Sequence, residues 1–319
     1  MLRGIQGMKA RLRLYLKAGS LVGQHGFPKR VLWFQGGVGD LLLCTAIARE
    51  MRKRNNRGPW MATNHSDLFA GNSDFEAIIP HDEQSMNAVR FLGAQTLEPR
   101  YAPDIPGEDR QLNPGCHIIA KMCQLAGITG SVELKPYLHL SDTELAYGNM
   151  VERQIAIQSS NVGGRWPALT KQWYPERFQS VVDLLKSEFN FVQLGSQNDP
   201  AIEGAVDLRG KTTLRETAAI LSSSIMLVGL EGMLMHMARA VECPSVIVYG
   251  ARVLPSEIGY SANENLYVPM PCSPCWKYNS CEIDRECMQR ISVDEVVAAI
   301  RRKSNHPTKP LVVDQAWIA

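Results

Sequence analysis

The stretch VLWFQGGVGDLLLCTAIAREMRKR, residues 31–54, decides the fold that we expect for this chain. Residues 31–35 form a short apolar run, three glycines follow closely, and after Asp40 apolar side chains recur at helical spacing. This pattern predicts a buried strand, a tight turn and a helix, which is the first βα unit of an open α/β sheet. Ligands of such sheets bind at the carboxyl ends of strands, so Gly36, Gly37 and Gly39 are expected to let a ligand approach the backbone closely.

Asp40 has two interpretations in this turn. An acid at the start of a helix stabilises the N-terminal amides, which is a purely structural role. The same side chain projects towards the expected ligand and is therefore a candidate base. The pattern leaves both open. The turn is not a P-loop, because GGVGDLLL lacks the Lys-Ser/Thr pair that reaches phosphates and metal.

Length and composition indicate a globular chain of about two domains. The 319 residues are 45% hydrophobic and 21% charged, and the formal net charge is +2. That charge hides an asymmetry, because residues 1–58 carry +10 and the remainder −8. There is no run of about 18 apolar residues that would predict a transmembrane helix, and nothing predicts a nucleic-acid partner. We therefore expect a cytoplasmic protein that is soluble or peripheral.

The first 21 residues alternate Lys and Arg with apolar side chains and contain no apolar run long enough for a signal peptide. An amphipathic helix that lies on anionic lipid is one interpretation, and it predicts peripheral attachment to the inner face of the membrane. An ordinary helix packed on its own domain is the other.

Alternating strands and helices organise the rest of the chain, most clearly in its second half. Residues 81–112 are rich in Pro, Gly and charge and are predicted to form loops. Strand patterns restart near residue 155, so we place the domain boundary at about 150, which gives domains 1–150 and 151–319. The predicted strands are 60–63, 75–80, 155–158, 191–194, 225–229 and 245–249, and the predicted helices are 113–126, 141–151, 175–188, 213–221, 232–241 and 292–302.

Eight cysteines fall into two groups. Those scattered in apolar surroundings are expected to be small core residues: Cys44, Cys116, Cys123 and Cys243. The others cluster with the spacing C-x2-C-x5-C-x5-C: Cys272, Cys275, Cys281 and Cys287. Four thiolates on one zinc or iron ion would order a loop that has little apolar area of its own. The alternative is four reduced cysteines without an ion.

Several motifs together resemble those of glycosyltransferase family nine, the ADP-heptose glycosyltransferases. They are GGVGDLLLCTAIAREMR, KQWYPERFQSVVDLL, FVQLGSQND and the long run from VDLRGKTT to VIVYG. The resemblance covers most of residues 31–300, is dense over 170–250 and is weak over 81–140. It implies a GT-B fold, in which two Rossmann-like domains face one another across a cleft. It also implies inverting transfer of heptose from ADP-heptose to a hydroxyl of lipopolysaccharide core, protein or small glycoside, with no cofactor for the transfer.

The resemblance assigns roles to particular residues. Asp40 corresponds to the family's base, and Lys171 in TKQW corresponds to its phosphate-binding lysine. The alternative for Lys171 is a solvated loop lysine. Further donor-binding residues that the resemblance implies are Gly37, Gly39, Ser159, Ser160, Gly195 and Thr212.

Residues 229–236 depart from the family pattern. The family usually reads Gly-Asn-Asp-Ser-Gly-Pro-Met-His, whereas this chain reads Gly-Leu-Glu-Gly-Met-Leu-Met-His. The acid that touches the donor sugar becomes Glu231, and the glycine that lets helix amides approach the diphosphate becomes Met233, with Gly232 beside it. His236 is kept. These changes leave open two alternatives: a GT-B-fold binding protein with a drifted donor site, and a transferase that uses another nucleotide sugar.

A protein-modifying branch of the family holds iron in a four-cysteine site. The spacing C-x2-C-x11-C in this chain is similar to part of that site, but the branch's upstream cysteine would fall at Arg252, with Cys281 as the substitute. The match to that site is partial, so a structural zinc or iron ion and four reduced cysteines both stay open. A displacement assisted by Asp40 has no step that requires a thiolate, so we expect the four cysteines to be structural rather than catalytic.

Overall fold

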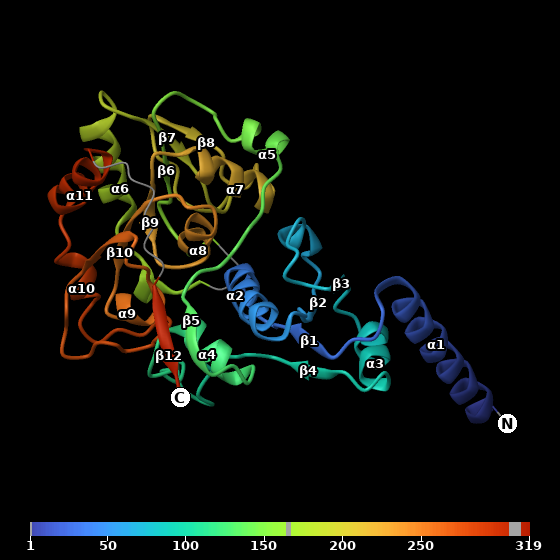
Figure 1. Ribbon diagram of the computed structural model, residues 1–319. Helices are drawn as coiled ribbons and strands as arrows, with labels where there is room; N and C mark the ends of the chain where they lie inside the picture. Colours follow the sequence, from blue (N-terminus) through green and yellow to red (C-terminus); the bar gives the residue numbers. More distant parts are fainter. Residues whose placement is uncertain (1, 164–166, 306–313) are drawn as a thin grey trace.

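Two parallel sheets organise the computed structural model, which describes residues 2–163, 167–305 and 314–319 and, for residues 2–7, the backbone alone (Figure 1). The first domain is built on a four-stranded sheet with the order β3-β2-β1-β4, and every neighbouring pair in it is parallel. Its strands are β1 (Arg30–Trp33), β2 (Trp60–Ala62), β3 (Ala77–Ile79) and β4 (Gln95–Leu97). Its helices are α1 (Leu2–His25), α2 (Val38–Asn55), η1 (Ser66–Phe69), α3 (Glu83–Phe91) and α4 (Ile118–Leu125).

The second domain is built on a six-stranded parallel sheet with the order β11-β10-β9-β6-β7-β8. Its strands are β6 (Gln154–Ile157), β7 (Asn190–Gln193), β8 (Ala205–Asp207), β9 (Leu227–Leu230), β10 (Ser245–Tyr249) and β11 (Asn263–Tyr267). Its helices are η2 (Leu169–Lys171), α6 (Pro175–Leu185), α7 (Leu214–Ser223), α8 (Met233–Ala240), α9 (Pro255–Ile258), α10 (Glu286–Gln289) and α11 (Val293–Asn305). The strand order reverses between β6 and β9, and such a reversal opens a crevice at the carboxyl ends of the strands.

A connecting segment joins the domains and carries α5 (Asp142–Tyr147). Ser141 and Glu144 form the predicted capping box at its start. The strand β12 (Gln315–Ile318) pairs antiparallel with β5 (Gly130–Glu133), so the end of the chain returns to the first half. The division at residue 150 stays a prediction.

The prediction of loops over residues 81–112 is wrong for part of that stretch, which contains α3 and β4. Asp82 caps α3, because its carboxylate accepts the amide of Ser85 at 2.7 Å. Met86 and Val89 then bury one face of the helix. β4 is only three residues long and has no buried alternation, which is why pattern reading misses it.

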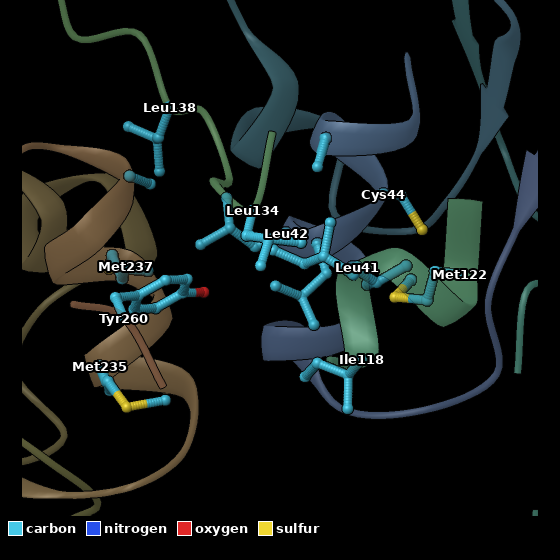
Figure 2. Close-up of a cluster of buried hydrophobic side chains, with 14 of the residues drawn as sticks. Leu41, Leu42, Cys44, Ile118, Met122, Leu134, Leu138, Met235, Met237 and Tyr260 are labelled. Carbon is cyan, nitrogen blue, oxygen red and sulfur yellow. The ribbon is translucent and has the colours of Figure 1, made fainter. Parts of the chain in front are cut away.

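One apolar cluster spans both domains (Figure 2). Helix α2 packs against α4 on the first domain and against α8 on the second. Leu41 and Leu42 from α2 and Met235 and Met237 from α8 all belong to the cluster and are buried. The domains therefore touch through a hydrophobic contact between these two helices.

Helix α1 extends from the first domain (Figure 1). Its second half packs on the domain through Leu14, Ala18 and Leu21, and Tyr15 meets the ring of Phe91 at a centroid distance of 5.2 Å. Across the described residues, no helix is both long and apolar enough to cross a membrane.

Candidate functional site

Asp40 lies directly after β1, on the first turn of α2. One carboxylate oxygen, Oδ2, accepts the amide of Gly37 at 3.0 Å, so the structural capping role exists. The other, Oδ1, accepts the hydroxyl of Tyr101 at 2.8 Å. Tyr101 follows β4, the strand beside β1, and the sheet order reverses between these two strands. Asp40 therefore sits at the crevice of the first domain.

Burial raises the pKa of Asp40 above the ordinary carboxyl value. The hydrogen bonds from Tyr101 and Gly37 and the charges of Lys171 and Arg100 pull it down, but by less than burial raises it. A carboxylate with a raised pKa is a better proton acceptor. The local environment therefore gives Asp40 the property that a base needs.

Lys171 ends the short helix η2, and its ammonium group lies 2.9 Å from Oε2 of Glu231. Burial lowers the pKa of Lys171, and the charge of Glu231 offsets only part of that shift. Because Asp40 also acts on this pKa, Lys171 lies within electrostatic reach of it. The interpretation of Lys171 as a solvated loop lysine is wrong, since its side chain is only 20% exposed and is paired.

Glu231 follows β9 and is almost completely buried. Its Oε1 has no hydrogen-bond partner among the described residues. A buried carboxylate oxygen without a donor is costly unless a ligand supplies one. This oxygen therefore indicates an acceptor position for a hydroxyl group of a ligand.

The starts of α2 and α8 meet at Gly39. A Cβ atom at Gly39 would lie 3.3 Å from the Cα of Met233, so a side chain here would push the two helices apart. Gly232 has φ +145, a conformation that is essentially restricted to glycine. The backbone on both sides of this contact thus depends on glycine.

His236 is buried on α8, and its Nδ1 lies 2.6 Å from the hydroxyl of Tyr260. Burial lowers the pKa of His236 to about 3, so the ring is neutral at physiological pH. Tyr260 also lines a pocket of about 320 Å³ together with His117 and Asp314. None of the predicted site residues lines that pocket.

The remaining predicted donor residues are engaged with protein groups. Ser159 donates to the carbonyl of Pro200 at 2.7 Å, and Ser160 donates to Gln172 at 3.1 Å; both side chains are fully buried. Gly195 follows β7 with φ +138, and the hydroxyl of Thr212 pairs with that of Thr217 before α7. The structure brings Asp40, Lys171 and Glu231 together. Ser159, Ser160, Gly195 and Thr212 are not part of this group.

The cysteine-rich segment, residues 272–287, connects the two domains, and we call it the cysteine strap. The amide of Tyr278 donates to the carbonyl of Asp109 at 3.0 Å. The carboxylate of Asp109 accepts the amides of Asn279 at 2.9 Å and Ser280 at 2.6 Å. The strap also contacts η2, the helix that carries Lys171. The hydroxyl of Thr170 donates to the backbone carbonyls of Lys277 and Tyr278 in the strap.

The prediction that the four strap cysteines hold an ion is not met by this arrangement. Across the described residues, which include the whole strap, no three His, Cys, Asp or Glu side chains are grouped as a metal requires. Hydrogen bonds to the first domain and the buried ring of Trp276 already order the strap. The strap is therefore ordered by these contacts, which is the role for which the sequence predicts an ion. The cysteines differ in environment: Cys272 and Cys281 are exposed, Cys275 is half-buried and Cys287 is buried.

Of the scattered cysteines, Cys44, Cys123 and Cys243 are buried as expected, whereas Cys116 is exposed. Cys116 lies in the turn just before α4, which begins later than predicted.

Sequence reasoning missed three residues near Asp40 and Lys171: Tyr101, Arg252 and Gln111. Tyr101 and Gln111 lie within residues 81–112, where the sequence predicts loops. Arg252 follows β10, and among the sequence motifs it enters only as the position of the branch's upstream cysteine. Its place at the carboxyl end of a predicted strand is the signal that could have found it.

Comparison with known proteins relates part of the second domain to a known family. Residues 165–283 match the family model of glycosyltransferase family 9 (heptosyltransferase). No curated protein has a matching sequence.

Several solved structures share the fold, among them three with TM-scores of 0.64 to 0.69. The iron-containing dodecameric glycosyltransferase TibC from enterotoxigenic E. coli H10407 is 17% identical, with a TM-score of 0.69 over 88% of this chain and 77% of TibC. TibC in complex with ADP-D-beta-D-heptose gives 15% identity and a TM-score of 0.67 over the same shares. E. coli ADP-heptose lps heptosyltransferase II is 14% identical, with a TM-score of 0.64 over 87% of this chain and 99% of that one. At these identities the likeness establishes the fold, and the predicted GT-B architecture is confirmed.

Proposed function

Because residues 165–283 are a family 9 glycosyltransferase segment on a GT-B fold, we propose that this protein is an inverting glycosyltransferase that moves heptose from ADP-heptose to a hydroxyl acceptor. The observation that carries the proposal is the convergence of Asp40 from one domain with Lys171 and Glu231 from the other. A base and a cation held on opposite sides of a cleft are what an in-line displacement requires.

The reaction follows from these roles. The acceptor oxygen attacks the anomeric carbon of the donor sugar, and its proton passes to the carboxylate of Asp40. The bond from the anomeric carbon to the diphosphate oxygen breaks, and the electron pair leaves with the diphosphate. Lys171 stabilises that negative charge, which is greatest in the transition state.

Tyr101 prepares Asp40 for this role. Its hydroxyl donates to Oδ1 and holds the carboxylate in one orientation. A carboxylate oxygen has room for more than one donor. An acceptor hydroxyl can therefore approach Oδ1 while Tyr101 stays in place.

The free oxygen of Glu231 supports recognition of the donor sugar. Oε2 is taken by Lys171, and Oε1 has no partner, so it is available to a sugar hydroxyl. A buried acceptor of this kind discriminates strongly against a ligand that lacks the hydroxyl, because the acceptor would then stay unpaired.

A donor panel tests the proposal. We expect calorimetry to give tightest binding with ADP-heptose among ADP-, UDP- and GDP-sugars, and ADP release when an acceptor is added. Tighter binding of a UDP- or GDP-sugar would identify that nucleotide sugar as the donor in place of ADP-heptose. Failure to bind any nucleotide would reject the proposal.

A binding protein with a drifted donor site is the second candidate. It is favoured by the Lys171–Glu231 ion pair, in which the cation that should meet phosphate is already neutralised within the protein. Micromolar binding of ADP-heptose without ADP release on lipopolysaccharide core, protein or small glycoside would support this candidate over the enzyme.

Helix α1 supports peripheral attachment to an anionic membrane. Met8, Leu12 and Leu16 are 67%, 57% and 65% exposed and recur every four residues, so they share one face. Lys and Arg residues lie between them, and each contributes on the order of 1 kcal/mol near an anionic surface. Removal of residues 1–21 should abolish flotation with anionic liposomes. Equal flotation of both proteins would reject membrane attachment and favour packing of α1 on its own domain as its only role.

A further inference from the structure

Arg252 is a buried cation that the proposed chemistry has not used. It follows β10, the strand beside β9, and is only 4% exposed. One guanidinium nitrogen, Nη2, donates to Oε1 of Gln111 at 2.7 Å, while Nε has no partner. Among the described residues Arg252 forms no ion pair with an Asp or Glu. An arginine stays charged in proteins, so this arrangement is costly until an anion completes it.

The surroundings hold the guanidinium group in place. Its central carbon lies 5.2 Å from the ring centroids of both Trp276 and Tyr278, which come from the cysteine strap. The amide of Trp276 donates to the carbonyl of Arg252 at 2.9 Å. Gln111 is fixed in turn, because its side-chain amide donates to the carbonyl of Ala102 at 2.9 Å. Three segments of the chain thus converge to position one arginine.

Arg252 shares its surroundings with the proposed reaction centre. Its positive charge contributes to lowering the pKa of Lys171 and acts on the hydroxyl of Tyr101, the partner of Asp40. Two cations therefore lie near one another, and only Lys171 has a carboxylate partner. The guanidinium group of Arg252 therefore lacks an anionic partner, which a phosphate group of a ligand can supply.

We propose that Arg252 binds the diphosphate of the nucleotide-sugar donor, as a second cation beside Lys171. This inference rests on the proposed function and deepens it. A planar guanidinium group can donate two parallel hydrogen bonds to phosphate oxygens, which an ammonium group cannot. Arg252 would hold the leaving group in one orientation and stabilise the charge that it gains when the bond to the sugar breaks.

The position of Arg252 favours the donor over an anionic group on the acceptor. It lies on the second domain, at the carboxyl end of the strand next to the one that presents Glu231. In doubly wound sheets this edge, near the point where the strand order reverses, is the ligand site.

The test compares full-length Arg252→Gln, Arg252→Lys and wild type in calorimetry with ADP, adenosine and inorganic pyrophosphate. Arg110→Gln is the control, since Arg110 is an exposed arginine beside the strap whose side chain pairs with Glu108. We expect Arg252→Gln to weaken ADP and pyrophosphate binding about 10- to 100-fold while adenosine binding is unchanged. Arg252→Lys should lose less, and Arg110→Gln should match wild type.

Other outcomes separate the alternatives. An equal loss of ADP and adenosine affinity together with a lower melting temperature would mean a structural role and overturn the proposal. Unchanged ADP binding, with or without a raised KM for the acceptor, would also overturn it. If wild type binds pyrophosphate through Arg252 but no ADP, the anion site stands and the proposed donor fails. If wild type binds neither, both fail.

Discussion

The two domains meet through two contacts of opposite character. Helices α2 and α8 meet through buried apolar side chains (Figure 2). A Cβ atom at Gly39 would lie only 3.3 Å from the Cα of Met233. The cysteine strap meets residues 104–111 through hydrogen bonds, many of them exposed to water. One contact is held by close packing and the other by directional polar pairs.

The difference teaches where the cleft can open. Separating α2 from α8 exposes apolar surface to water, which costs about 25 cal/mol of free energy per Å². Opening the strap exchanges hydrogen bonds for bonds to water, at a net cost of roughly 0.5–1.5 kcal/mol each. We therefore expect the α2–α8 contact to stay closed while the strap side admits ligands.

Truncating the apolar contact should have the largest effect on stability. Leu42 is fully buried in the cluster that both domains share. Leu42→Ala should lower the free energy of unfolding by roughly 2–5 kcal/mol, because it leaves a cavity. Denaturant unfolding measures this, with Leu184→Ala on the exposed side of α6 as the control. Equal, small changes in both variants would show that the shared core contributes little.

Adding a side chain at the contact between α2 and α8 should have the second-largest effect. Gly39→Val places methyl groups against the backbone of Met233, so we expect roughly 1–3 kcal/mol of destabilisation. It also displaces Asp40, the next residue, so turnover should fall by about 100-fold. Gly23→Val is the control, because a Cβ atom there meets nothing within 4 Å. A Gly39→Val enzyme with wild-type activity would contradict the close contact.

The contrast also explains what the sequence could predict. The apolar strand and the helical pattern after it predict the glycine turn and the place of Asp40. Lys171 and Glu231 are implied only by the resemblance to the family. Tyr101 and Arg252 join them only through pairings between distant segments, which no local period encodes. The prediction of an ion in the strap rests on its small apolar area, and the sequence gives no sign of the hydrogen bonds to residues 104–111 that order it.

Weakening the polar contact should have a smaller effect. Asp109→Ala removes the acceptor of two strap amides, so we expect about 1 kcal/mol of lost stability. Hydrogen exchange should quicken at residues 278–280 and stay unchanged in α2. Faster exchange in both regions would show that the two contacts open together.

The stability of the contact between the strap and residues 104–111 should depend on pH. Burial alone would raise the pKa of Asp109, but the amides of Ser280 and Asn279 outweigh it and hold this pKa below the usual range. The contribution of Asp109 is therefore present above the unfolded value of about 3.9 and is lost as the pH falls through the lower folded value.

The smallest effect is expected from Tyr101, the hydrogen-bond partner of Asp40, and it concerns the pH dependence of kcat/KM. Burial raises the pKa of Asp40, and the hydrogen bond from Tyr101 lowers it. Tyr101→Phe removes the lowering, so the acid limb of kcat/KM should move to higher pH. The exposed Tyr147→Phe is the control. An acid limb that moves to lower pH would contradict the assignment of Asp40.

The central claim is that Asp40 takes the acceptor proton on a donor held by the opposite domain. The most direct measurement is ADP release from ADP-heptose by Asp40→Asn, together with its affinity for ADP. Loss of a general base lowers kcat by about 10²- to 10⁴-fold, and ADP affinity should stay within a few fold of wild type because Lys171 and Arg252 are untouched. Full turnover by Asp40→Asn would contradict the account.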